Sequence, residues 1–99
     1  MGRKKLVEIL DKEIRKKVKD VEGTYLVVYD NYRGKYSKEF YQRILELQSM
    51  GYKIMRIQKS VYLCEGLQAA IILSELAEHH DAEVRIFKVE KEIFKEEWK

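Results

Sequence analysis

The sequence contains no proline, one cysteine, and no apolar run as long as the ~20 residues that a membrane-spanning helix needs. We therefore expect no membrane protein, and the charged first residues do not resemble a signal peptide. Cys64 has no second cysteine to pair with, which favours a reducing compartment and predicts a cytoplasmic protein. The lack of proline beside many lysine, arginine and glutamate residues is compatible with a thermophilic source.

The sequence also lacks the compact motifs that carry most enzyme chemistry, such as a glycine-rich phosphate loop, a nucleophile elbow or two histidines four residues apart. His79, His80 and Asp81 are adjacent, so their side chains point apart. They are more typical of a helix C-terminus than of a metal site. Cys64 lies in an apolar segment without a neighbouring base, which predicts an inert core thiol.

The size and composition predict one globular domain. The chain has 99 residues, of which 45% are hydrophobic and 37% are charged. Residues 1–22 hold eight basic and five acidic side chains, which accounts for the whole net charge of +3, while the remainder holds twelve of each. This excess positive charge near the start indicates an anionic partner as one possibility.

The first segment has the pattern of an amphipathic helix from Leu6 to Val21, ended by Gly23. Its basic face has two interpretations. It is either the solvated face of a helix that docks on the domain, which is the commoner role of such a face, or a nucleic-acid-binding stripe. The apolar stripe consists of Leu6, Leu10, Ile14, Val18 and Val21, and the basic face consists of Lys5, Lys12, Arg15, Lys16 and Lys19.

The rest of the chain predicts alternating strands and helices. We first expect a strand over Tyr25–Asp30 and then a helix from an N-cap at Ser37 to Gly51, with Phe40, Ile44 and Leu47 facing inward. Tyr52–Glu65 should form either one long bent strand or two short strands that meet near Lys59 and Ser60. A helix over Leu67–His79 and a strand over Ala82–Val89 should follow. Residues 90–98 fit either a last strand or a helical tail. The fold class is therefore α+β, a ferredoxin-like βαββαβ sheet over residues 24–90 with an additional N-terminal amphipathic helix (1–22) and a tail (91–99). Right-handed connections should place both later helices on the same face of this sheet.

The first strand is apolar on both faces, with Tyr25, Val27 and Tyr29 on one side and Leu26 and Val28 on the other. Strands of this kind need cover on both faces. We expect the N-terminal helix to cover part of the second face and a second copy of the chain to cover the rest, so the sequence predicts a homodimer. Further contributors to this face are expected among Ile54, Ile57, Val61, Ile86, Phe87 and Val89, and Ile93, Phe94 and Trp98 of the tail could reach the partner.

Asp30 ends this apolar strand and opens a short basic and aromatic loop, a common place for functional residues. In the loop, tyrosine rings can stack on bases and cations can neutralise phosphates. A purely structural role is equally consistent with the sequence, in which Asp30 and Asn31 satisfy turn backbone groups and Gly34 supplies a positive φ. The candidate nucleic-acid-binding residues of the loop are Tyr32, Arg33, Lys35 and Tyr36.

Three stretches together resemble the small CRISPR-associated Cas-two family: TYLVVYD, then GYKIMRIQKSVYLCEG, then AEVRIFKV, with helices between them. The run from Ile57 to Tyr62 is similar to a V-Q-x-S-V-F pattern of that family, and Glu65-Gly66 to the E-G that follows it. The resemblance spans roughly residues 24–90. The chain departs from the family in its first core helix, where SKEFYQR replaces an arginine-rich stretch, in the short link after Gly66, and in the additional N-terminal helix.

The resemblance implies a ferredoxin-like homodimer that binds DNA or RNA and scaffolds the spacer integrase. It also implies Asp30 as the catalytic residue and the Mg²⁺ ligand of a metal-dependent endonuclease, with one carboxylate from each subunit. The alternative is a non-enzymatic protein that binds DNA or a host protein. Small proteins of archaeal filamentous viruses, which act in the host cytoplasm, are similar to the chain in size and charge-rich composition.

Overall fold

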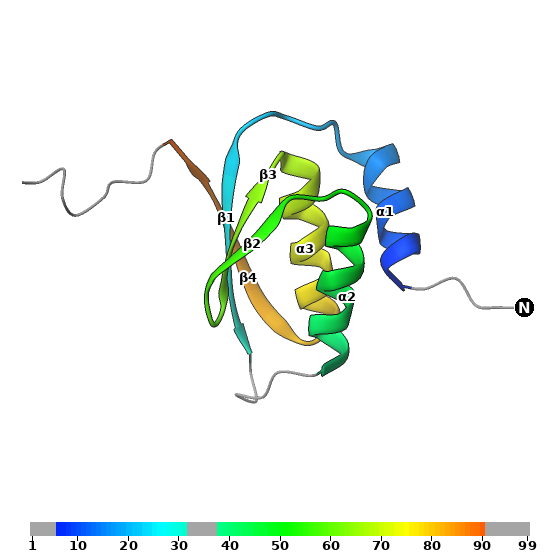
Figure 1. The fold of residues 1–99 in the computed structure, drawn as a ribbon. Helices are drawn as coiled ribbons and strands as arrows, with labels where there is room; N and C mark the ends of the chain where they lie inside the picture. The colour runs from blue at the N-terminus through cyan, green and yellow to red at the C-terminus, as the bar shows by residue number, and fades with distance from the viewer. Residues whose placement is uncertain (1–5, 32–37, 91–99) are drawn as a thin grey trace, which may run out of the picture.

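The computed structural model describes residues 6–31 and 38–90, which form three helices and a four-stranded sheet of the α+β class (Figure 1). None of the described helices is long and apolar enough to span a membrane. The elements are α1 (Leu6–Lys17), β1 (Thr24–Asn31), α2 (Lys38–Ser49), β2 (Ile54–Gln58), β3 (Val61–Glu65), α3 (Leu67–His79) and β4 (Ala82–Val89).

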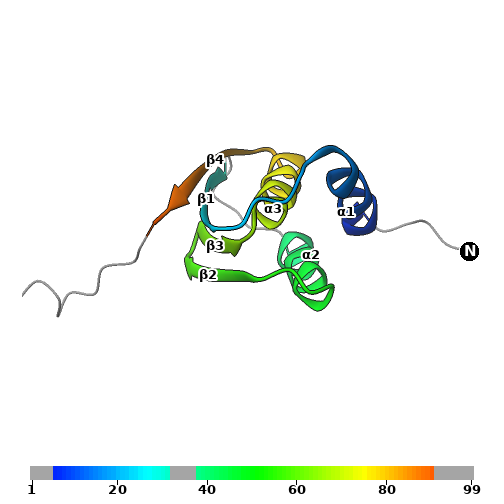
Figure 2. The ribbon, with the colours of Figure 1, turned by 90° about the horizontal axis from the view of Figure 1, so that it is seen from above.

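The strands lie in the order β2-β3-β1-β4, and every neighbouring pair is antiparallel. Because β3 lies between β1 and β2 and is antiparallel to both, β1 and β2 run parallel to each other. In the same way β3 and β4 are parallel, with β1 between them. Each parallel pair is connected by one helix, and α2 and α3 both cover the same face of the sheet, as predicted (Figure 2).

The bounds of α3 and β4 agree with the sequence prediction, and the segment over residues 52–65 forms two short strands, the second of the two alternatives. A turn at Lys59–Ser60 joins them, and a bulge lies between Arg56 and Gln58. The predicted inward stripe of α2 is confirmed, since Phe40, Ile44 and Leu47 are all buried. Gly51 ends α2 as expected, with a φ of 102° that favours glycine.

Helix α3 is apolar on nearly all sides because it lies between two other layers. One side packs on the sheet and the other packs on α1 (Figure 2). Cys64 of β3 is also fully buried in this core, and its burial raises the pKa of its thiol to about 12. The thiol is therefore protonated at neutral pH, which agrees with an inert core residue. The buried residues of α3 are Ala69, Ala70, Ile72, Leu73, Ser74, Leu76 and Ala77.

Helix α1 ends at Lys17, four residues before the predicted end at Val21. The backbone that follows bonds to the start of α3 instead of continuing the helix. The carbonyl of Val21 accepts from Leu67 N at 2.9 Å, and the Asp20 carboxylate accepts from Gln68 N at 3.1 Å. These bonds satisfy amide groups that the first turn of α3 leaves without a partner in the helix. Val21 consequently remains 43% exposed and does not belong to the buried stripe.

The position of α1 also differs from the prediction. We expected this helix to cover the second face of the sheet, but it lies on the far side of α3 and α2 and forms a third layer (Figure 2). Its buried residues are Val7 and Ile14, and both belong to the same hydrophobic core as α3. The outer side of α3 is apolar, and α1 buries its own apolar stripe against it.

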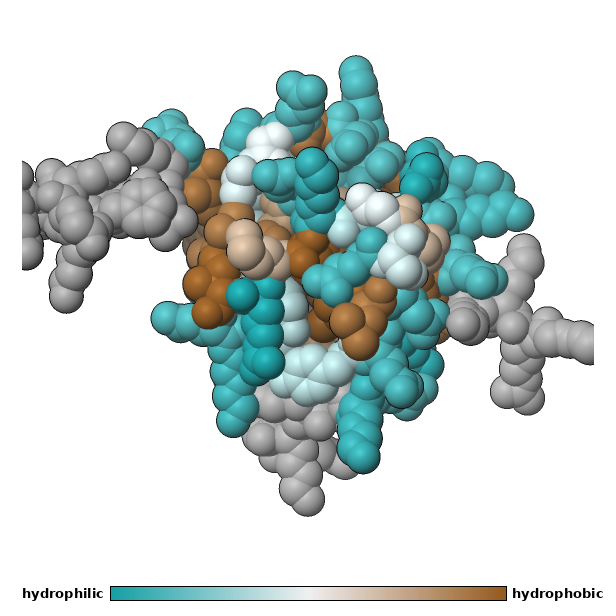
Figure 3. Space-filling model, viewed as in Figure 1, coloured by the Kyte–Doolittle hydropathy of each residue, from teal (hydrophilic) through white to brown (hydrophobic). Residues whose placement is uncertain are grey.

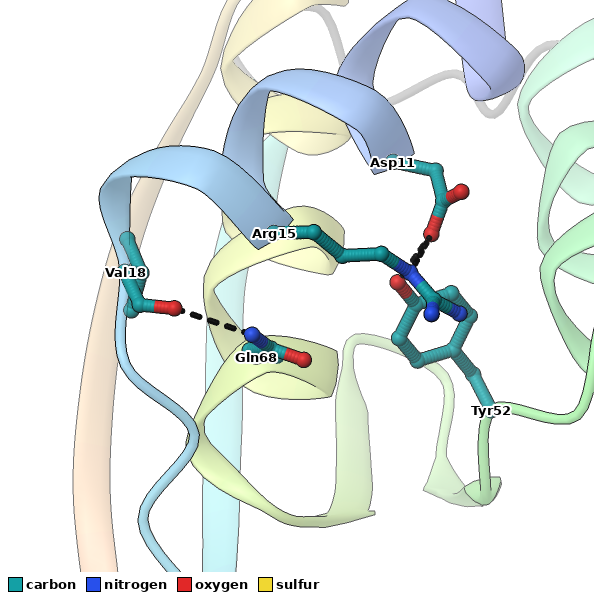
Figure 4. Close-up of polar contacts among 5 residues, drawn as sticks. All are labelled: Asp11, Arg15, Val18, Tyr52 and Gln68. Carbon is teal, nitrogen blue, oxygen red and sulfur yellow. Dashed lines mark hydrogen bonds and ion pairs between the residues drawn. The ribbon is translucent and has the colours of Figure 1, made fainter.

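Polar contacts hold α1 at this position (Figure 4). The Asp11 carboxylate accepts hydrogen bonds from the Tyr52 hydroxyl and from Arg15 Nε, the latter at 2.8 Å, and Gln68 Nε2 donates to the carbonyl of Val18 at 2.9 Å. Burial alone would raise the pKa of the Asp11 carboxyl, but the bonds from Tyr52 and Arg15 outweigh it and hold this pKa below its ordinary value. Asp11 is therefore ionised at neutral pH, and it ties α1 to the connection between α2 and β2.

Candidate functional site

The most distinctive surface is the face of the sheet turned away from α2 and α3, which we call the open face. The strand register aligns four apolar residues on it in one row: Met55 opposite Leu63, Leu63 opposite Leu26, and Leu26 opposite Phe87. Residues directly opposite each other in antiparallel strands point to the same side. With about 4.8 Å between neighbouring strands, the row extends roughly 14 Å across the sheet.

The row is partly exposed to solvent. Met55 and Phe87, on the two edge strands, are 62% and 49% exposed, and Leu26 and Leu63 are half-buried. Among residues 6–31 and 38–90, the helices that pack on the sheet are α2 and α3, and they cover its other face (Figure 2). Figure 3, which views the sheet close to edge-on, shows hydrophobic side chains gathered at the left over the strands. Val28, Val61 and Val89 extend this apolar surface on the open face.

The alternation predicted for the first strand is confirmed, since Tyr25, Val27 and Tyr29 are buried while Leu26 and Val28 are half-buried on the opposite side. Two residues predicted for the open face lie on the other side instead. Ile54 is 6% exposed and lies opposite Cys64, and Ile86 lies opposite Val27, so both face the helices.

Ile57 was also predicted for the open face, and it is the extra residue of the bulge in β2, where it is 48% exposed. At a bulge the strict alternation of side chains is interrupted. The predictions for Val61, Phe87 and Val89 are confirmed by the register, which places them on the open face.

The chemistry of the open face suits an apolar protein surface better than nucleic acid. Sheets that read single-stranded RNA present aromatic rings on which bases stack. Here the strand tyrosines, Tyr25, Tyr29 and Tyr62, are buried on the helix side. Phe87 is the only aromatic residue that the described strands place on the open face.

Asp30 is exposed at the end of β1, where it borders the open face. Its cross-strand neighbour is Glu83 of β4, so the two carboxyl groups lie side by side on one face. Adjacent like charges repel each other, and a bound cation relieves that repulsion. Glu83 could not be recognised as a neighbour of Asp30 from the sequence, because only the register of β1 with β4 brings the two together. The described residues contain no group of three or more potential metal ligands.

The predicted nucleic-acid loop, Tyr32, Arg33, Lys35 and Tyr36, lies outside the described residues. The flanking residues Asn31 and Lys38 belong to the end of the molecule that also carries the β2–β3 turn and the α3–β4 turn (Figure 1). We call this the loop end. Near it, the Arg56 guanidinium lies over the ring of Tyr41, with its carbon 5.4 Å from the ring centre. Lys38 and Lys59 are further exposed cations of the loop end.

The basic residues predicted on the first helix do not form one site with Asp30. Helix α1 and the open face lie on opposite sides of the α2–α3 layer (Figure 2). Lys12, Lys16 and Lys19 are exposed, whereas Arg15 is paired with Asp11 and lies 5.7 Å from the ring centre of Tyr52. Residues 6–22 contain five basic and five acidic side chains, so the described part of this segment carries no excess charge.

Two places therefore remain as candidate sites, the open face with its row of four apolar residues and the loop end with Asp30, Glu83 and nearby cations. Comparison of the chain with models of protein families, with curated proteins and with solved structures finds no match. The function must consequently be inferred from the residues of these two places.

Proposed function

We propose that the protein is a homodimer, joined through the open face, that binds nucleic acid with its loop ends. The observation that carries this proposal is the row Met55–Leu63–Leu26–Phe87, which crosses all four strands without cover from any described helix. Two such faces can pack on each other about 10 Å apart, as sheets do in sandwiches. Each copy would then remove its exposed apolar surface from water.

Beyond the α+β class, the strand order supports the expected ferredoxin-like arrangement. In such a fold two βαβ units are split, each by a strand of the other. The unit β1-α2-β2 contains β3 between its parallel strands, and the unit β3-α3-β4 contains β1 between its own. A relation to the Cas-two family remains part of the proposal. The run Ile57–Tyr62, on which the resemblance partly depends, crosses the bulge of β2, the turn and the start of β3.

Binding of nucleic acid at the loop end is supported by the cations and aromatic rings at that end. Lys38, Lys59 and the Arg56–Tyr41 pair lie on elements that border it. The sequence adds Arg33, Lys35 and two tyrosines between β1 and α2. Lysine and arginine neutralise phosphates, and tyrosine rings stack on bases.

A gel shift at two salt concentrations tests this binding. The logarithm of the association constant should fall with the logarithm of salt with a slope of about −0.9 per duplex phosphate contacted. Three contacts would thus weaken binding roughly 40-fold between about 50 and 200 mM salt. The double variant Lys38→Gln/Arg56→Gln should reduce both the affinity and the slope.

The matched control is Lys12→Gln/Lys16→Gln, which removes the same charge from α1 and should change binding little. If this control loses affinity instead, α1 and not the loop end is the nucleic-acid surface. Absence of any shift at the lower salt concentration would contradict nucleic-acid binding and favour the alternative of a protein that binds a host protein.

A second candidate function, a Mg²⁺-dependent endonuclease, is favoured by the cross-strand pair of Asp30 and Glu83. Mg²⁺ is commonly held by one or two carboxylates together with substrate phosphates. We expect cleavage of an oligonucleotide with Mg²⁺ to fall to background in Asp30→Asn and to weaken strongly in Glu83→Gln. Glu78→Gln, which removes an exposed carboxylate of α3, serves as the control. Cleavage that persists in purified Asp30→Asn would rule out this function for the site.

A further inference from the structure

His80 lies at the C-terminal cap of α3, where it contacts the first half of α2. Its Nε2 is 3.2 Å from the NH1 group of Arg43, and its ring centre is 5.3 Å from that of Phe40, in an edge arrangement. Phe40 is 3% exposed, and its other side packs edge-on against Tyr29 at 5.3 Å. His80 thus connects the start of α2 to the turn between α3 and β4.

The contact with Arg43 determines the protonation state of the imidazole. A guanidinium group carries only donors and stays charged, so Nε2 must accept the hydrogen bond. His80 is therefore neutral in this arrangement, with its proton on Nδ1. Protonation of Nε2 would remove the acceptor and place two positive charges 3.2 Å apart.

The charged groups around His80 come from three elements. Arg43 and Glu39 belong to α2, His79 precedes His80 on α3, and Asp81 follows it in the turn. Burial, then Arg43 and His79, lower the pKa of His80 below its ordinary value of 6.5, and Glu39 and Asp81 only partly offset this. Glu39 is directly engaged with Arg43, whose NH2 group donates to its carboxylate at 2.6 Å, so Arg43 is held toward the imidazole.

We propose that His80 is a pH-sensitive switch whose protonation releases the start of α2 from the turn between α3 and β4. The direction of the pH effect on release follows from linkage, because the released state binds the proton more tightly than the closed state does. Release is therefore disfavoured above about pH 6.5 and becomes more favourable as the pH falls below that value. Each unit by which the pKa of His80 differs between the two states corresponds to tenfold in the release equilibrium.

The test is amide hydrogen exchange followed by NMR at about pH 7.5 and pH 5, expressed as protection factors. These factors correct for the intrinsic effect of pH on exchange, so they report opening alone. In the wild type, protection over Gln42–Glu46 of α2 should fall several-fold or more at the lower pH, relative to the central residues of α3. In His80→Gln the amide oxygen can accept from Arg43 at both pH values, and the relative fall should disappear.

His79→Gln is the matched control, because it removes the neighbouring imidazole and leaves the Arg43–His80 contact in place. It should keep the relative fall in protection at the lower pH, reduced only by the loss of the His79 charge that helps to lower the pKa of His80. A fall of equal size in His80→Gln, or no relative fall in the wild type, would overturn the proposal.

Titration of the His80 ring, followed by NMR in the wild-type protein, tests the proposal without any substitution. A midpoint below 6.5 is expected, and a midpoint at or above 6.5 would overturn the proposal as well. None of these measurements depends on nucleic-acid binding.

Discussion

Replacing Ile14 with alanine should lower the free energy of unfolding by about 2 to 5 kcal/mol. Ile14 is 7% exposed and packs from α1 into the core that α3 shares with the sheet. The truncation removes buried methyl groups and leaves a cavity between α1 and the helices below it. Because small domains have a total stability of about 5–15 kcal/mol, this loss should be plain in urea-induced unfolding followed by circular dichroism.

Ile9→Ala is the matched control, because it makes the same change on the same helix at a position that is 40% exposed. We expect it to cost less than about 1 kcal/mol. Helix propensity changes equally in both variants, so the difference between them measures the docking of α1. If both variants lowered the free energy of unfolding equally, the docking of α1 as a third layer on α3 would be contradicted.

Replacing Phe87 with glutamate should raise the dissociation constant of the proposed dimer by about 30-fold or more. Phe87 ends the apolar row of the open face, and a glutamate there would bring an unpaired carboxylate into the contact between two copies. A loss of 2 kcal/mol, the usual threshold for an important interface residue, corresponds to roughly 30-fold. Phe87 is 49% exposed in the single chain, so the fold itself should tolerate the change.

Leu45→Glu provides the control for this prediction. Leu45 is 63% exposed on α2, away from the open face, and the variant adds the same charge. Its dissociation constant should match that of the wild type in analytical ultracentrifugation. Dissociation by Leu45→Glu without dissociation by Phe87→Glu would assign the interface to the helical side.

Local sequence patterns were sufficient to predict most of the elements. Helix α3 and strand β4 have their predicted bounds because each is an uninterrupted apolar or alternating run between clear turn residues. The end of α1 was not predictable in this way. The apolar period continues to Val21, but the carbonyls of Val21 and Gly23 and the Asp20 carboxylate accept hydrogen bonds from residues 66–68, and these contacts cannot be read from the local sequence.

The placement of layers and side chains needed long-range information. Apolar stripes predicted that α1 docks on something, but the sheet and the outer side of α3 are both apolar, and a stripe does not choose between them. The sides of Ile54 and Ile86 depend on the strand register, and in β2 the bulge between Arg56 and Gln58 interrupts the alternation of side chains at Ile57. Asp30 could be predicted as a candidate site residue from its position at a strand end. Its neighbour Glu83 could be found only from the pairing of β1 with β4.

Sedimentation equilibrium of the wild-type protein at low micromolar concentration tests the dimer through the open face most directly. One chain has a mass of 11.9 kDa. We expect a mass of twice this value for the wild type, returning toward that of one chain in Phe87→Glu. A wild-type protein that sediments with the mass of a single chain throughout this concentration range would contradict the proposed dimer.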